Sequence, residues 1–507
     1  MIYIGKELIT VEKLVQVARF NEKVGLDETG KKNILESNAR LERIVAKGKP
    51  VYGINTGFGI FADKKIKPEE ISKLSRNLII SHAVGTGEPL PIEVTRAAIL
   101  VRANTLARGF SGVRIKIVET LIEMLNKGVT PVVPSQGSLG SSGDLCQLSH
   151  MALVFTKDEK DTDEESGWAE YNGKIMRGKA AMAEAGIERI QLGAKEGLAI
   201  NNGATFSAAL GTFSLWECDY LMKLADQSLA LSCEALIAYS AAFDARLHNA
   251  RGQVGQIASA EEIRKNIYGS TLLDSTDRVQ DAYSLRCAPQ IHGSVRDTFE
   301  HVKRVIELEL NAATDNPLLF EPDVALSGGN FHGEPVGMVL DFLSIALCEL
   351  GAIAERRVFR LTDEKLNQGL PPMLVDSIEA AGLNSGLMMP QYTAASLVLE
   401  NQTLATPDSV HSLPTSAEQE DHNANAMTAA RHCWMILQNV QHILSIEIFV
   451  AARAADLRLR ANKNGKLGLG NKRLHDRIRK EGPYEADDRL WGPQIETVKL
   501  LVKDHVL

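Results

Sequence analysis

The chain has 507 residues, of which 24% are charged and 5% are aromatic, and its formal net charge is -8. The negative charge argues against a nucleic acid or an anionic membrane surface as the binding partner. The length permits a large buried core in one domain or two, and the few aromatic residues favour a core of small aliphatic side chains, as in packed helices.

The cysteines and the N-terminus indicate the cellular setting. The six cysteines are dispersed and form no Cys-x-x-Cys pair, so we expect reduced thiols rather than a disulfide framework or a zinc site. Lys6, Glu7 and Glu12 precede any long apolar run, which is not the pattern of a signal peptide. Since no stretch approaches 18 uncharged apolar residues, we expect a cytoplasmic protein without a membrane span.

The N-terminal part of the chain combines short helices with glycine-rich loops. Residues 10–20 predict a short amphipathic helix with Thr10 as its N-cap. Residues 51–59, Val-Tyr-Gly-Ile-Asn-Thr-Gly-Phe-Gly, form a glycine-punctuated loop that contains Tyr52. Residues 157–165 are strongly charged and predict a solvated segment, whereas Asn172-Gly173 predicts the two-residue turn of a β-hairpin.

A second glycine-rich loop, residues 137–145, reads Gly-Ser-Leu-Gly-Ser-Ser-Gly-Asp-Leu and leads into an apolar helix expected over residues 145–155. Asp144 occupies the N-cap position of that helix, and the glycines permit backbone angles that are closed to other residues. The loop matches neither the Gly-x-Ser-x-Gly of a nucleophile elbow nor the Gly-Lys-Ser/Thr of a phosphate-binding loop. From composition alone, an ordinary glycine-rich turn stays open.

From about residue 200 the pattern changes to long helices. Apolar residues recur at steps of three and four over residues 221–235 and 437–455, and residues 334–357 behave similarly. Helices this long and apolar predict an up-and-down bundle whose outer faces pack on partner subunits. Residues 462–471, rich in Gly, Asn and Lys, predict a flexible connection before a last helix over residues 495–507.

Six motifs, in the same order along the chain, resemble those of a known enzyme family. They are residues 137–145, Glu-Gly-Leu-Ala-Ile-Asn-Asn-Gly at 196–203, Gln-Asp-Ala-Tyr-Ser-Leu-Arg-Cys at 280–287, Asp-Asn-Pro at 315–317, Ser-Gly-Gly-Asn-Phe-His at 327–332 and Pro-Thr-Ser-Ala-Glu-Gln-Glu-Asp-His at 414–422. The chain is thereby similar, from about residue 50 to residue 460, to the histidine, phenylalanine and tyrosine ammonia-lyases.

The resemblance implies a fold and a prosthetic group. The fold is mainly α, of the fumarase/aspartase-like superfamily, with an N-terminal lobe over residues 1–197 that has a little β structure and an elongated helical-bundle domain over residues 198–507. In the family an Ala-Ser-Gly triplet cyclises with loss of two waters to 4-methylidene-imidazol-5-one (MIO), which here implies Ser141, Ser142 and Gly143. Ser141 departs from the usual alanine, but its side chain would hang from the ring without forming it, so we expect cyclisation to proceed.

The resemblance assigns four catalytic residues. Tyr52 matches the base that removes the β-proton of the substrate, and a phenol with its ordinary pKa of about 10 needs a positive field to act near neutral pH. Ser142 would supply the methylidene carbon, Asn202 would hydrogen-bond the oxygen of the ring, and Tyr283 would assist near the substrate.

Further residues match substrate-binding positions of the family. Arg286 would hold the substrate carboxylate with its guanidinium fork, although for a single arginine a structural salt bridge is the more common role. The other matches are His82, Gln280, Asn316, Phe331 and Glu420. No His-Glu-x-x-His or comparable ligand spacing occurs in the sequence, and we expect neither a metal nor a nucleotide.

Glu420 favours the histidine branch of the family, because it offers a carboxylate to an imidazole. The resemblance therefore implies a carbon–nitrogen lyase that eliminates ammonia from L-histidine to give trans-urocanate, the first step of histidine degradation. A tyrosine or phenylalanine ammonia-lyase, or a 2,3-aminomutase, is the alternative within the family. An inactive helical scaffold is a remote alternative, against which the retention of Tyr52, Ser142, Gly143 and Arg286 argues. Family members are homotetramers with shared active sites, and the apolar central helices agree with this.

Overall fold

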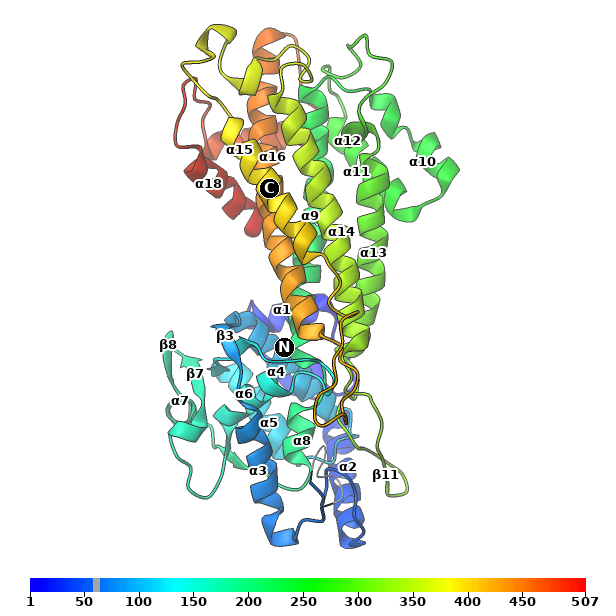
Figure 1. The fold of residues 1–507 in the computed structure, drawn as a ribbon, viewed down its shortest axis with the longest axis vertical. Helices are drawn as coiled ribbons and strands as arrows, with labels where there is room; N and C mark the ends of the chain where they lie inside the picture. The colour runs from blue at the N-terminus through cyan, green and yellow to red at the C-terminus, as the bar shows by residue number, and fades with distance from the viewer. Residues whose placement is uncertain (58–63) are drawn as a thin grey trace. The chain divides into compact units, whose positions relative to one another are not determined.

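The computed structural model of the protein describes residues 1–57 and 64–507, so residues 58 and 59 of the predicted Tyr52 loop lie outside the described residues. The chain is mostly helical with a few short strands, which confirms the predicted fold class (Figure 1). The longest helices lie beyond residue 204, in the part of the chain where the three- and four-residue spacing of apolar side chains predicts long helices.

The chain divides into two compact units. The first comprises Met1–Trp216, Val302–Asp341 and Pro407–Arg431, and the second comprises Glu217–His301, Phe342–Thr406 and His432–Leu507. This division differs from the single boundary predicted between residues 197 and 198. The reason is that two later segments, which carry Asn316, Phe331 and Glu420, fold together with the N-terminal residues.

The first unit is built from short elements around one buried helix. Its elements are β1 (Ile2–Ile4), α1 (Val11–Ala18), β2 (Val24–Leu26), α2 (Glu28–Ala46), η2 (Pro68–Glu70), α3 (Ile71–His82), β3 (Thr86–Pro89), α4 (Ile92–Ala107), α5 (Ile115–Lys127), β4 (Thr130–Pro131), β5 (Pro134–Gln136), α6 (Leu145–Phe155), β6 (Thr156–Lys157), η3 (Glu164–Ser166), β7 (Trp168–Tyr171), β8 (Lys174–Arg177), α7 (Gly178–Glu184), β9 (Ile190–Gln191), α8 (Glu196–Asn201), β10 (Leu318–Phe320) and β11 (Val324–Leu326). Every residue of α4 from Val94 to Ala107 is buried, and α4 packs against α1, α2 and α5.

The strands form small sheets rather than one large one. β1 pairs with β2 and β6 with β9 in parallel, whereas β3–β5, β10–β11 and β4–β7–β8 are antiparallel. Asn172 and Gly173 connect β7 to β8 with φ of 51° and 75°, which confirms the predicted hairpin. The predicted helix after Thr10 is confirmed as α1, and Thr10 accepts a hydrogen bond from the backbone N–H of Lys13.

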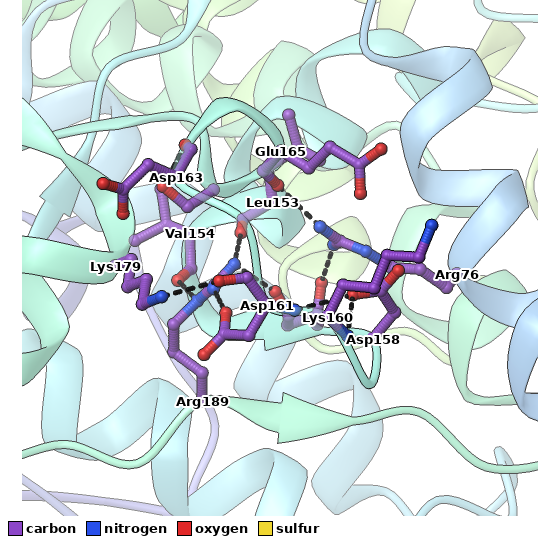
Figure 2. Close-up of polar contacts among 12 residues, drawn as sticks. Arg76, Leu153, Val154, Asp158, Lys160, Asp161, Asp163, Glu165, Lys179 and Arg189 are labelled. Atoms are coloured by element: carbon purple, nitrogen blue, oxygen red, sulfur yellow. Dashed lines mark hydrogen bonds and ion pairs between the residues drawn. The ribbon is translucent and has the colours of Figure 1, made fainter.

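The charged segment at residues 157–165 is anchored more firmly than its composition predicts. Figure 2 shows Arg189 and Arg76 among the polar contacts of this segment. The buried Arg189 pairs with Asp161 and donates to the carbonyl oxygens of Leu153, Val154 and Thr156. Arg76 of α3 donates to the Glu165 carbonyl oxygen at 2.6 Å. The segment is therefore tied to Arg76 in the middle of α3 and, through Arg189, to the C-terminal end of α6, and is not simply solvated.

The second unit is helical and contains buried ion pairs. Its elements are η4 (Ser240–Phe243), α10 (Ala245–Arg251), α11 (Val254–Ile267), α12 (Tyr283–Arg286), η5 (Pro372–Leu374), η6 (Ile378–Ala380), α15 (Met388–Leu404), α17 (Leu469–Glu481) and α18 (Trp491–Lys503). The helices α9 (Thr205–Ala235), α13 (Ala288–Glu309), α14 (Glu334–Thr362) and α16 (Ala426–Ala461) have residues in both units. Arg357 of α14 makes a fully buried bidentate pair with Glu447 of α16, which also accepts from Ser232 of α9.

Two helices have the length and composition of a membrane span. They are α14 and α16, but 72% and 78% of the residues in their most apolar windows are buried inside the protein. Core helices of globular proteins have the same composition, so burial accounts for the apolar character of both helices. All six cysteines lie in the described residues, and none of them is paired with another there.

Candidate active site

A cavity of about 1380 Å³ lies in the first unit and brings together most of the predicted site residues. Its lining includes Tyr52, His82, Ser141, Ser142, Asn202, Asn316, Phe331 and Glu420. These residues come from widely separated stretches of the sequence, and the fold brings them together at the cavity. Their roles stay predictions, but their proximity is a property of this fold.

Tyr52 lies on a tight turn that is braced from within. The side chain of Asn55 accepts from the Val51 N–H at 2.8 Å and donates to the Lys49 carbonyl oxygen at 3.0 Å. Gly53 adopts a φ of 69°, and a Cβ there would lie 2.5 Å from a methyl group of Leu198 on α8. Ile54 packs into a buried cluster with residues of α2 and β10. The turn is therefore anchored on both sides of Tyr52, and the phenol is presented to the cavity.

The loop that carries Ser141, Ser142 and Gly143 is held by backbone bonds from distant segments. The Leu139 carbonyl oxygen accepts from the N–H groups of Ala424 and Asn425, and the Gly140 carbonyl oxygen accepts from Gly333 at 2.9 Å. The Gly140 oxygen also accepts from the Gly143 N–H at 3.3 Å, which closes a turn around the two serines. The loop is thus compact and is held from both sides.

Gly143 and Gly203 approach each other so closely that neither position has room for a side chain. A Cβ on Gly143 would lie 2.1 Å from the Gly203 carbonyl carbon, and a Cβ on Gly203 would lie 2.4 Å from the Thr314 hydroxyl oxygen. The two glycines form a β-bridge, in which the Gly203 carbonyl oxygen accepts from the Asp144 N–H at 2.9 Å. Both have positive φ, of 81° and 113°.

Two donors converge on the carbonyl oxygen of Ser142. The side-chain amide of Asn202 donates to it at 2.9 Å, and the Gly203 N–H donates at 3.2 Å. Both donors follow directly after α8, so the C-terminal end of this helix delivers them. Donors in such positions stabilise negative charge that develops on the oxygen.

Asp144 begins α6 as predicted, but its side chain does not cap that helix. The carboxylate turns instead to Ser207 on α9, accepting from its N–H and its hydroxyl, and it accepts from the Ser138 hydroxyl at 2.9 Å. Burial raises the pKa of Asp144, and these donors oppose the rise. The residue ties the loop to α9, which is a longer-range role than sequence position alone predicts.

Glu420 reaches the loop from the opposite end of the sequence. Its two carboxylate oxygens accept from the two neighbouring serines, Oε2 from the Ser141 hydroxyl at 2.7 Å and Oε1 from the Ser142 hydroxyl at 2.8 Å. The backbone of Glu420 is fixed by a bridge to Thr415, whose N–H donates to the Glu420 carbonyl oxygen at 2.8 Å.

The turn between Thr415 and Glu420 is left-handed. Ser416, Ala417 and Glu418 have φ of 51°, 52° and 67°, although none is a glycine. A left-handed conformation costs an ordinary residue roughly 1–2 kcal/mol, so the turn stores strain at the cavity wall. Its effect is to point Glu420 back toward the serines.

Three histidines line the same cavity. Burial lowers the pKa of His82, which keeps its imidazole neutral near pH 7, while the nearby Glu420 carboxylate opposes this shift. His332 and His422 stack with ring centroids 6.0 Å apart. Since His332 Nδ1 accepts from the Glu334 N–H, its Nε2 carries the proton that is donated to the His422 carbonyl oxygen.

Asn316 lines the cavity with its amide already engaged. Its nitrogen donates to the Ser327 hydroxyl at 2.9 Å, and its oxygen accepts from the Gly328 N–H at 2.8 Å. It thereby fixes the start of the segment that presents Phe331, a second cavity residue. The structure gives Asn316 a structural role beside its predicted place among the substrate-binding residues.

Three predicted site residues belong to the second unit and do not line this cavity. They are Gln280, Tyr283 and Arg286. Arg286 donates to the Asp281 carbonyl oxygen at 2.8 Å and lies over the Tyr283 ring, 4.6 Å from its centroid. The Tyr283 side chain is largely exposed. Within the second unit, Arg286 and Tyr283 therefore contact each other.

Sequence reasoning missed part of the cavity wall. Lys64, Asn77, Gln419 and His422 also line it. Gln419 and His422 flank Glu420 in the last motif, and this adjacency is the one signal that could have indicated them. Within residues 1–57 and 64–507, no group of three or more His, Cys, Asp or Glu side chains is arranged to hold a metal ion.

Comparisons with known proteins identify the family of the chain. Residues 9–480 match the family model described as aromatic amino acid lyase. The histidine ammonia-lyase of Caldanaerobacter subterraneus subsp. tengcongensis is 47% identical over 487 residues, which cover 95% of this chain and 93% of the relative.

Solved structures give the same result. The crystal structure of histidine ammonia-lyase from Trypanosoma cruzi has a TM-score of 0.89 and 35% identity, and the match covers 99% of this chain and 93% of that chain. Tyrosine aminomutase from Streptomyces globisporus has a TM-score of 0.92 and 33% identity, with 99% and 97% covered. The resemblance predicted from the motifs is confirmed: the chain belongs to the aromatic amino acid lyase family, a family of carbon–nitrogen lyases.

Proposed function

We propose that the protein eliminates ammonia from L-histidine to give trans-urocanate. The observation that carries this proposal is the place of Glu420, whose carboxylate faces the serines of the loop inside the cavity that Tyr52 lines. A carboxylate is a good acceptor for an imidazole N–H, whereas a phenyl ring offers it no hydrogen-bond donor. The relatives named histidine ammonia-lyase support the same substrate.

We infer that Ser141, Ser142 and Gly143 cyclise to MIO, and the residues present fit that group. Gly143 has no space for a side chain, and two donors already hold the Ser142 carbonyl oxygen, which remains on the ring. When formed, the group supplies an electrophilic carbon that binds the amino group of the substrate and makes it a better leaving group.

The other chemistry falls to side chains of the cavity. Tyr52 lines the cavity, where its phenolate would remove the β-proton of the substrate. Glu420 would orient the imidazole, and the neutral His82 offers a hydrogen-bonding partner beside it. Asn202 and the Gly203 N–H would draw electron density toward the Ser142 oxygen, which favours attack by an amine.

The substrate carboxylate requires a cation, and we propose that another copy of the chain provides it. Arg286 and Tyr283 belong to the second unit and do not line the cavity of their own chain. A homotetramer with shared sites, in which Arg286 of one copy serves the cavity of another, would complete the site.

The decisive assay incubates the purified protein with L-histidine and follows the near-ultraviolet absorbance of the conjugated product and the release of ammonia. L-Tyrosine and L-phenylalanine are tested in parallel. We expect product from histidine alone and a native intact mass that is lower than the sequence mass by two waters. The variant Ser142→Ala should keep the full sequence mass and lose turnover. Turnover of tyrosine or phenylalanine instead of histidine would refute the proposed substrate.

Glu420→Gln tests the role of the carboxylate. The amide keeps the shape but loses the charge, so we expect kcat/KM for histidine to fall roughly 100-fold, which is the effect of losing a charged hydrogen bond in a buried site. Glu418→Gln is the matched control, because Glu418 is exposed on the same turn and does not line the cavity. It should keep activity within about twofold of the native protein, since surface changes have small effects. Near-normal activity of Glu420→Gln would remove the basis for histidine as the substrate.

A further inference from the structure

The two serines of the loop differ in what cyclisation does to them. Ring closure joins the Gly143 nitrogen to the Ser141 carbonyl carbon, and the departing water takes the Ser141 carbonyl oxygen with the amide protons of Ser142 and Gly143. The second water takes the Ser142 hydroxyl together with the Ser142 Cα proton and leaves a C=C bond. The Ser141 hydroxyl takes part in neither step and survives.

This difference bears directly on Glu420. Before cyclisation both carboxylate oxygens are engaged, Oε2 by Ser141 at 2.7 Å and Oε1 by Ser142 at 2.8 Å. Cyclisation removes the Ser142 hydroxyl and so releases Oε1, while Oε2 keeps its donor. One oxygen of Glu420 is then tied and the other is available to a ligand.

We propose that Ser141 is a positioning residue that holds the Glu420 carboxylate for the substrate imidazole. The inference rests on the proposed function and deepens it. Ser141 is 7% exposed, so water competes little for its hydroxyl. The Thr415–Glu420 bridge fixes the backbone of Glu420, but three side-chain torsions remain free beyond it. The Ser141 hydrogen bond restrains those torsions and fixes the distance from the carboxylate to the ring.

The residue type at 141 matters for this role because alanine has no hydroxyl. A chain with alanine there can cyclise equally well, since the side chain takes no part in ring closure. It would leave Glu420 without its donor on Oε2. Ser141 therefore contributes to the selection of a ligand with a ring N–H and not to the making of the electrophile.

The test compares Ser141→Ala with Ser141→Thr, which keeps the hydroxyl. Intact mass reports cyclisation, and calorimetry reports binding of two unreactive acids, imidazole-4-propionate, which has a ring N–H, and 3-phenylpropionate, which has none. We expect both variants to lose two waters. In Ser141→Ala, Kd for imidazole-4-propionate and KM for L-histidine should rise about tenfold with kcat less affected, and Kd for 3-phenylpropionate should stay within about twofold. Ser141→Thr should restore the native values.

The other possible results contradict either the positioning role of Ser141 or the proposed function. A cyclised Ser141→Ala with native Kd and KM for the imidazole ligands refutes the positioning role, and so does equal weakening of both acids. Failure of Ser141→Ala to cyclise, with Ser141→Thr cyclised, would assign Ser141 to maturation and also refute it. If the native protein cyclises but neither binds imidazole-4-propionate nor converts histidine, the proposed function fails independently of Ser141.

Discussion

At the scale of single residues, the sequence indicates which side chains can carry out the chemistry, but it does not indicate which side chains are hydrogen-bonded to each other. Tyr52, Asn202 and Glu420 could be singled out because their residue types and immediate neighbours match a known chemistry. The contact between Ser141 and Glu420 could not, because 279 residues separate the two, and a hydrogen bond across that separation depends on the whole fold. For the same reason the Asp144 carboxylate was expected at the start of α6 and is found on Ser207.

Glu309 provides a residue-scale prediction about pH. Burial raises the pKa of this carboxyl group from 4.5 to about 7, and the Arg102 guanidinium opposes the rise. The folded protein therefore binds this proton more tightly than the unfolded chain does, so its contribution to stability is present below pH 4.5 and is lost as the pH rises through 7. The loss amounts to about 3 kcal/mol at most.

The measurement is the melting temperature of Glu309→Gln relative to the native protein at pH 5.5 and at pH 8. The variant has no titrating group at this position. We therefore expect its melting temperature, relative to that of the native protein, to be higher at pH 8 than at pH 5.5. Glu300→Gln, on an exposed part of the same helix, should show no such gain. An equal difference at the two pH values would mean that the folded state does not hold the proton on Glu309.

At the scale of elements, periodicity predicts the long helices and local chemistry predicts the turns. The apolar spacing indicates α9, α14 and α16, and Asn172-Gly173 indicates the β7–β8 hairpin. Two elements escape this reasoning. Residues 462–471 are predicted as a flexible connection, yet helix α17 begins within them at Leu469 and packs against α11. The left-handed turn at Ser416–Glu418 contains no glycine, so its residues do not predict it.

That turn gives the element-scale prediction. Ala417 is exposed and has a φ of 52°, so its side chain contributes strain and little packing. Ala417→Gly should raise the free energy of unfolding by up to about 1 kcal/mol, because glycine adopts this conformation without strain. Ala417→Val should lower it by at least as much, since a branched side chain is least tolerated there. Thermal unfolding of both variants checks the pair, and a shift of the same sign in both would show that the turn is not left-handed.

At the scale of the whole molecule, the order of the sequence does not give the order of the units. The family resemblance implies a single boundary between residues 197 and 198, yet residues 302–341 and 407–431 fold with the N-terminal stretch. These returning segments bring Asn316, Phe331 and Glu420 to the cavity. The proposed completion of the site by another copy is likewise outside the reach of sequence patterns, because it depends on assembly.

Shared sites predict complementation between defective chains. Tyr52→Phe and Arg286→Ala should each be nearly inactive alone, but co-expressed chains should regain roughly a quarter of native activity, because random assembly leaves some sites with both native residues. Tyr52→Phe co-expressed with Ser142→Ala is the control. Both of those residues line one cavity within a single chain, so this pair should recover nothing. Recovery in neither mixture would mean that Arg286 serves its own chain.

The contact between Gly143 and Gly203 also limits which mutations the codons of these two residues can tolerate. Every change at the first or second base of a glycine codon installs a residue with a Cβ, or a stop, and a Cβ at either position would collide with neighbouring backbone or with Thr314. A library that randomises these two codons and is selected for growth on the substrate should return glycine at both, with variation confined to the silent third base. At these two codons we expect selection to remove nearly every missense change.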